Sequence, residues 1–157
     1  MSNLTVAALW ALLIGMAPHP WEGAAQVPEP IAIVVHESNP VRDLSMEELR
    51  RIYLGSITMF EHGERVVLLE ASEHRTSFYR SALDMGEDRL NRHWISRVFA
   101  GRAGSPPQEM RSDGELRSYV AAHAGAIAFL SAASVDDTVK VVTITGLGPD
   151  DAGYPLR

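Results

Sequence analysis

The chain has 157 residues, of which 46% are hydrophobic and 22% charged, a composition typical of one ordinary folded domain rather than of a disordered or fibrous protein. Its net charge of −6 argues against the basic surface that binds DNA, RNA or anionic membranes, so we expect no nucleic-acid partner. The absence of cysteine excludes disulfides, thiol chemistry and zinc–thiolate sites.

The N-terminus carries an apolar run, Leu4 to Ala17, that is too short to span a bilayer comfortably. Small residues at positions 23–25 follow it, and this combination is typical of a secretory signal peptide. We therefore predict a signal peptide over 1–25, a linker over 26–30 and one domain over 31–157, in a periplasmic or secreted protein. No Lys or Arg precedes the apolar run, so an uncleaved anchor, a misassigned start or a buried N-terminal helix remain alternatives.

Strands and helices alternate in the first half of the expected domain. Residues 31–36 are a β-branched run that predicts a buried strand. Ser45 and Glu48 have the spacing of a capping box, so we expect a helix to begin there and to end at Gly55. Residues 65–71 predict a second buried strand.

The second half is expected to contain three helices and two more strands. Gly and paired Pro at 101–108 predict a loop, because they deny hydrogen bonds to both helix and sheet. Apolar rather than alternating strands predict a mixed α/β fold with a largely buried sheet flanked by helices. Tyr79, Trp94 and Phe99 are expected in its core. The remaining predicted elements are helices from the bend at 72–76 to Gly86, over 88–100 and from Ser112 to 123–125, and strands over 126–131 and 139–144.

The polar bend that begins the second helix is the candidate binding site. A helix N-terminus attracts anions through its free N–H groups and its dipole. The donors expected to act with the N–H groups of 74–77 are Ser72, His74, Arg75, Thr76 and Ser77. His74 contributes charge only when it is protonated. The alternative is that Ser72 or a polar neighbour caps the helix while His74 and Arg75 point to solvent.

Other site chemistries have no pattern here. The histidines show no H-x₃-H or H-E-x-x-H spacing, so we expect no metal site and no cofactor. The serines lack the G-x-S-x-G elbow of a hydrolase nucleophile, and we expect no enzymatic activity.

Three segments in order resemble the phosphate-binding proteins of ABC transporters, in the type 2 periplasmic-binding-protein superfamily. They are LSMEELRRIYLGSITMF (44–60), RVVLLEASEHRTSFYRSAL (65–83) and YVAAHAGAIAFLSAASV (119–135). Residues 94–107 and 139–156 further resemble short, single-lobe members. The resemblance implies one lobe of this fold, binding phosphate or another small anion for ABC-type uptake or sensing, with a transporter permease or an envelope protein as partner.

The resemblance also allows the bend to be compared residue by residue. The family's phosphate turn reads Arg-x-x-Gly-Ser-Gly-Thr, and only Thr76 of positions 70–76 retains it. Glu70 replaces the arginine, and a carboxylate repels a nearby phosphate. Arg75 can offer a guanidinium fork from another direction. The alternative function is a one-lobe interaction module without a small ligand, because a missing lobe exposes the former cleft face.

Overall fold

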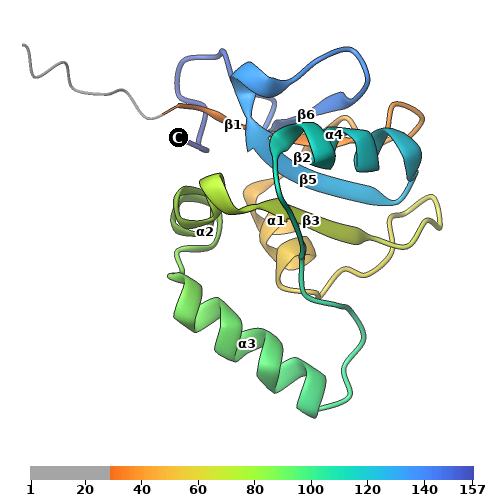
Figure 1. The fold of residues 1–157 in the computed structure, drawn as a ribbon, viewed down its shortest axis with the longest axis vertical. Coiled ribbons are helices and arrows are strands. Elements are labelled where there is room, and N and C mark those ends of the chain that lie inside the picture. Colours follow the sequence, from red (N-terminus) through yellow and green to blue (C-terminus); the bar gives the residue numbers. More distant parts are fainter. Residues whose placement is uncertain (1–28) are drawn as a thin grey trace, which may run out of the picture.

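The computed structural model describes residues 29–157, so the predicted signal peptide lies outside the described residues. The described chain forms a six-stranded mixed sheet in the order β2-β6-β1-β5-β3-β4, flanked by helices, which confirms the predicted fold class (Figure 1). The strands are β1 (Ile31–Val35), β2 (Asp43–Leu44), β3 (Val67–Ala71), β4 (Gln108–Met110), β5 (Ala126–Ser131) and β6 (Lys140–Ile144). The helices are α1 (Met46–Tyr53), α2 (Arg75–Leu83), α3 (Glu87–Phe99) and α4 (Asp113–Ala122), with short 3₁₀ turns at Ser72–His74 and Ala132–Ser134.

Strand direction changes within the sheet. The strand β1 is antiparallel to both of its neighbours, β5 and β6. In contrast, β3 runs parallel to β4 and β5, with Ala71 opposite Met110 and Leu69 opposite Ala128. The carboxyl ends of these three strands therefore meet at one edge of the sheet, where open α/β sheets commonly bind ligands.

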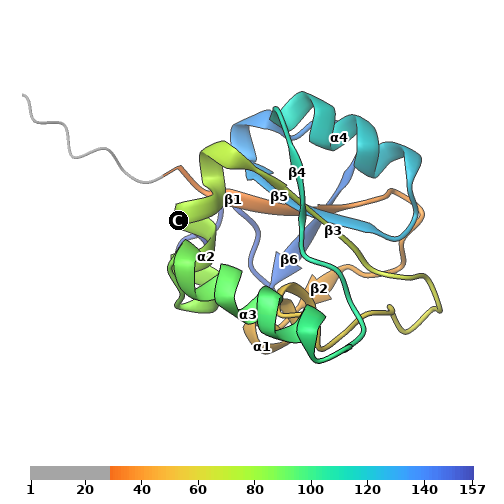
Figure 2. The same ribbon diagram turned by 60° about the horizontal axis from the view of Figure 1, so that its bottom comes forward.

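Helices cover both faces of the sheet, with α4 on one side and α1 and α2 on the other (Figures 1 and 2). The alternation along β1 divides the core accordingly. Ile31, Ile33 and Val35 pack in the cluster beneath α1 and α2, whereas Ala32 and Val34 pack in the cluster beneath α4. All five side chains are buried, which explains why the strand reads as a continuous apolar run.

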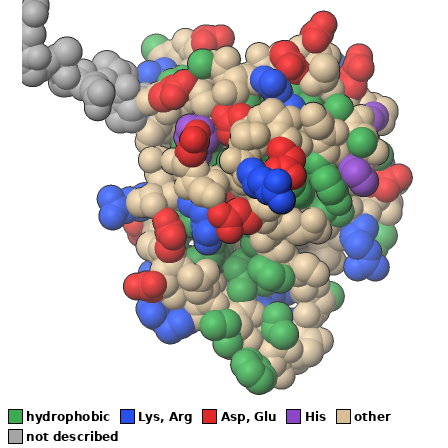
Figure 3. Space-filling view, in the orientation of Figure 1, with side chains coloured by type: hydrophobic (Ala, Val, Ile, Leu, Met, Phe, Trp, Pro, Cys, Tyr) green, Lys and Arg blue, Asp and Glu red, His purple; other side chains and the backbone are tan. Residues whose placement is uncertain are grey.

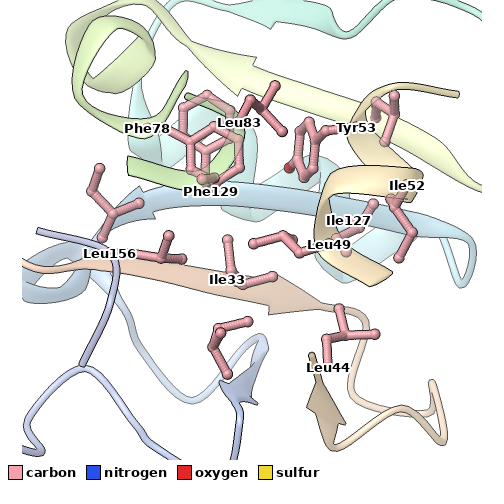
Figure 4. Close-up of a cluster of buried hydrophobic side chains, with 14 of the residues drawn as sticks. Ile33, Leu44, Leu49, Ile52, Tyr53, Phe78, Leu83, Ile127, Phe129 and Leu156 are labelled. Carbon is pink, nitrogen blue, oxygen red and sulfur yellow. The ribbon is translucent and has the colours of Figure 1, made fainter. Parts of the chain in front are cut away.

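Aromatic side chains pack against one another within the larger cluster, part of which Figure 4 shows in close-up. The rings of Phe78 and Phe129 are stacked with their centroids 3.9 Å apart. The ring of Tyr53 contacts that of Phe78 edge-on, with the two centroids 4.7 Å apart. This packing joins α1, α2 and β5 into one unit.

The predicted capping box is confirmed at the start of α1. The Glu48 N–H donates to Ser45 Oγ at 3.1 Å, and the Ser45 N–H donates to Glu48 Oε2 at 2.8 Å.

Two short strands, β2 and β4, were not predicted. Each has only two or three residues and owes its conformation to the neighbouring strand. The predicted loop at 101–108 therefore overlaps β4 by one residue, Gln108.

Helix α3 projects from the body of the molecule and is held to the end of α1 (Figure 1). The Arg97 guanidinium donates to the Gly55 carbonyl at 2.5 Å, and His93 Nε2 lies 3.0 Å from the Leu54 carbonyl oxygen. Trp94 is buried as predicted, but the prediction for Phe99 is wrong, because this side chain is 89% exposed. Phe99 is the last residue of α3, beyond the turn that packs on the body.

No helix within residues 29–157 is long and apolar enough to cross a membrane.

Candidate functional site

The candidate site lies where β3 passes into α2. The strand ends at Ala71, the 3₁₀ turn follows, and α2 begins at Arg75. No side chain caps either helical segment, so the alternative that Ser72 or a polar neighbour caps the helix is wrong. The 3₁₀ turn continues directly into α2, and the side chains of Ser72 and His74 reach carboxylates on β4 and α4 instead.

Two predicted hydroxyl donors are bound to carboxylates. Ser72 donates to Glu109 Oε1 at 2.5 Å, across to β4. Thr76 donates to Glu87 Oε1 at 2.5 Å, across to the first turn of α3. Both acceptors are acidic side chains of this chain, so both hydroxyl donors are already engaged.

The two predicted basic donors also face carboxylates. His74 Nε2 lies 3.5 Å from Asp113 Oδ2 at the start of α4. Arg75 Nε lies 3.3 Å from Glu70 Oε1, and its Nη1 lies 3.8 Å from Glu109 Oε2. The side chains of His74 and Arg75 are only 18% and 21% exposed, so the alternative that they point to solvent is wrong.

Ser77 is the exception among the five predicted donors. It is exposed on the first turn of α2, and its backbone carbonyl accepts from Ser81 at 2.8 Å. The structure therefore brings Ser72, Arg75 and Glu109 together, links His74 and Thr76 to separate carboxylates, and leaves Ser77 apart. Whether the five bind an anion stays a prediction.

Glu70 is the most unusual group at the site. It is 4% exposed, and its Oε2 atom is buried with no hydrogen-bond partner. Burial raises the pKa of Glu70 to about 7, although the Arg75 guanidinium works in the opposite direction. The carboxylates of Glu109 and Glu87 raise that pKa further. The Glu70–Arg75 contact is an ion pair without hydrogen-bond alignment, because Arg75 Nε also has no hydrogen-bond partner.

A groove of about 530 Å³ opens beside these charges, between α2, α3 and the segment that leads into β4. Glu70, Arg75 and Glu109 form its charged end. Hydrophobic side chains gather on the part of the surface formed by α3, below the charged groups (Figure 3). The other residues lining the groove are Tyr79, Leu90, Asn91, Trp94, Ile95, Val98, Phe99, Pro106 and Pro107. The groove is thus apolar along most of its length and acidic at one end.

Two more buried polar atoms on groove residues have no hydrogen-bond partner. They are the Tyr79 hydroxyl and the Trp94 Nε1–H. Buried polar atoms are normally paired, so unpaired atoms beside a groove are consistent with partners supplied by a ligand.

Within residues 29–157, no three His, Asp or Glu side chains gather as they would around a metal ion.

Sequence reasoning missed the acidic partners and the groove. Glu109 lies in the short strand β4, 37 residues from Ser72, and Glu87 opens α3, 11 residues from Thr76. The one available signal was Glu70 itself, an acidic residue inside an apolar strand run. A charge in such a run predicts a buried partner or an altered pKa.

Comparison with known proteins supports the fold. No family model matches the sequence. A phosphate transport receptor from Vibrio cholerae has a TM-score of 0.63 at 23% identity, over 77% of this chain and 48% of that one. PstS from Borrelia burgdorferi has a TM-score of 0.60 at 11% identity, and the match covers 82% of this chain and 54% of PstS. A phosphate-binding protein from Stenotrophomonas maltophilia has a TM-score of 0.54 at 17% identity, and the match covers 80% of this chain and 41% of that protein.

The chain thus spans about half the length of the solved structures that it matches. The match confirms the expected resemblance at the level of the fold. The identities are too low to transfer a ligand.

Proposed function

We propose that the protein is an exported, non-catalytic solute-binding domain that holds a small ligand where the β3–α2 turn meets the groove. One observation carries this proposal. A groove of about 530 Å³ ends on a buried carboxylate with an unpaired oxygen, at the carboxyl end of β3. This volume lies within the range of roughly 300–1,000 Å³ that is common for small-molecule sites. The fold shared with a phosphate transport receptor supports a role in solute binding.

The finer proposal is that phosphate or another small anion binds at Ser72, His74, Arg75, Thr76 and Ser77, for ABC-type uptake or sensing with a transporter permease. An anion at Arg75 has to compete with Glu70 and Glu109 for the guanidinium. Protonation of Glu70 removes one of these competing charges. We therefore expect anions to bind more tightly below pH 7 than above it.

Isothermal titration with phosphate and with sulfate at pH 5.5 and pH 8 tests the anion proposal. Sulfate keeps its charge over this range, so its pH dependence reports on the protein alone. We expect tighter sulfate binding at pH 5.5, a loss of binding in Arg75→Gln and no change in the matched control Arg80→Gln, which alters an exposed arginine of the same helix. If neither anion produces heat at millimolar concentration with folded protein at pH 5.5, the anion proposal is wrong.

Export is tested separately. We expect the mature N-terminus of the secreted protein to lie near residue 26, which mass spectrometry of the intact protein measures. Retention of residues 1–25 in the exported form would contradict the proposed signal peptide.

A second candidate function is an interaction module of the cell envelope without a small ligand. The exposed apolar side chains of α3 favour it, since Ile95, Val98 and Phe99 are 56%, 61% and 89% exposed. Exposed apolar patches commonly mark binding surfaces. Under this alternative, Val98→Asp should abolish binding to a purified permease or envelope partner. A groove that binds a small ligand, together with unchanged partner binding in Val98→Asp, would contradict it.

A further inference from the structure

We infer that the groove binds an organic cation with an apolar body, its ammonium group directed at Glu70 and Glu109 and its body lying along α3. This inference rests on the proposed function, because it takes the groove to be the ligand site. It reverses the ligand charge that the resemblance implies.

The charge at the charged end of the groove, formed by Glu70, Arg75 and Glu109, favours a cation. Two carboxylates, Glu70 and Glu109, face one guanidinium, that of Arg75. A third carboxylate, Glu87, contributes to the negative potential at Glu70. Above pH 7, where Glu70 is ionised, Arg75 neutralises only one of these charges, so a cationic ligand gains attraction there while an anion is repelled.

The Glu70 carboxylate is also incompletely bonded. Its Oε1 pairs with Arg75, whereas Oε2 is buried without a partner. A buried carboxylate oxygen in this condition lacks the hydrogen bonds that it has in water. An ammonium group donates up to three hydrogen bonds, so with a small shift of the side chain it supplies the missing donor.

The body of the groove suits an apolar group that carries a positive charge. Tyr79, Trp94 and Phe99 line it, and aromatic faces attract ammonium groups through cation–π interactions. Two of these rings already lie near cations of the protein. The guanidinium of Arg75 is 6.0 Å from the centroid of Tyr79, and that of Arg97 is 5.8 Å from Trp94.

The ionisation of Glu70 links such binding to pH. The charged and titratable groups that act on Glu70 are Arg75 from α2, Glu109 from β4, Glu87 from α3 and Tyr53 from α1. Tyr53 is buried, and its pKa is raised well above the ordinary range, so it stays neutral. The pKa of Glu70 is about 7, and an alkyl ammonium stays charged well beyond that value. Cation binding should therefore strengthen as the pH rises through 7, opposite to anion binding.

Isothermal titration with phenethylamine and with 3-phenylpropionate tests the inference, because the two probes share an aromatic body and differ in the sign of their charge. At pH 8 we expect the amine to bind at least about tenfold more tightly than the carboxylate. We expect roughly tenfold weaker amine binding at pH 5.5, where Glu70 is mostly protonated.

Matched variants assign the effect to the groove. We expect Glu70→Gln to lose about tenfold in amine affinity and the exposed Glu73→Gln to keep the affinity of the unmodified protein. Phe99→Ala removes a side chain that is 89% exposed, so it leaves the fold intact while weakening amine binding severalfold. Circular dichroism of each variant checks folding. Equal affinity for the two probes, or an unchanged affinity in Glu70→Gln, would overturn the inference.

The result also separates this inference from the proposed function. If phosphate or 3-phenylpropionate binds with folded protein and phenethylamine does not, the cation inference is wrong and solute binding stands. If none of the three probes binds at millimolar concentration at either pH, both fail.

Discussion

Replacing Glu70 with glutamine removes a buried charge whose pKa differs between the folded and unfolded chains. The ordinary pKa of a glutamate is 4.5, and burial raises that of Glu70 to about 7 in the folded protein. The folded state therefore binds more protons than the unfolded state between these two values. The stability contributed by protonated Glu70 is fully present below pH 4.5 and is lost as the pH rises through 7.

The magnitude follows from the two pKa values. At about 1.4 kcal/mol per pKa unit, the wild type loses about 2.5 kcal/mol of stability from this group between pH 5 and pH 8. The attraction to Arg75 is already included in the folded-state value. Glu70→Gln keeps the shape of the side chain and cannot ionise, so we expect this loss to be absent from the variant.

Urea denaturation followed by circular dichroism at pH 5, 6, 7 and 8 measures the effect. The difference between wild type and variant cancels the titration of the histidines, which both proteins share. The free energy of unfolding of Glu70→Gln, measured relative to wild type, should rise by about 2.5 kcal/mol between pH 5 and pH 8. The exposed Glu73→Gln serves as the control and should parallel the wild type. Parallel pH profiles for wild type and Glu70→Gln would refute the reasoning that a buried, incompletely paired carboxylate lies at this site.

Two further predictions concern packing. Gly55→Ala should destabilise the protein by about 2 kcal/mol or more, because Gly55 has φ +71° and an added Cβ would lie 2.6 Å from Trp94. Gly63→Ala is the control, because Gly63 has φ +93° and open space around it, so its loss of stability comes from backbone strain alone. An equal loss of stability in both variants would contradict a steric role for Trp94. Phe129→Ala should cost about 3–5 kcal/mol because its ring is fully buried, whereas Phe99→Ala should stay within about 0.5 kcal/mol. Thermal unfolding measures both, and similar losses for the two phenylalanines would contradict the exposure of Phe99.

The local elements were predictable because their signals are local. The β-branched run of β1 and the Ser45–Glu48 capping box each specify their conformation within a few residues. The position of the candidate turn, between an apolar strand and an amphipathic helix, followed in the same way. The strands β2 and β4 were missed because two or three residues carry no periodicity, and only hydrogen bonds to β6 and β3 make them strands.

The sequence by itself determined the mixed α/β fold and placed a cluster of polar donors after β3. The tertiary structure alone decided what those donors meet. Ser72 and Arg75 both reach Glu109, more than thirty residues away along the chain, because β3 and β4 pair in parallel and bring their ends together. Glu70 is paired with Glu109 in the same register and lies buried beside the apolar groove. Burial and long-range charge depend on which segments become neighbours, and no local pattern of residues encodes that.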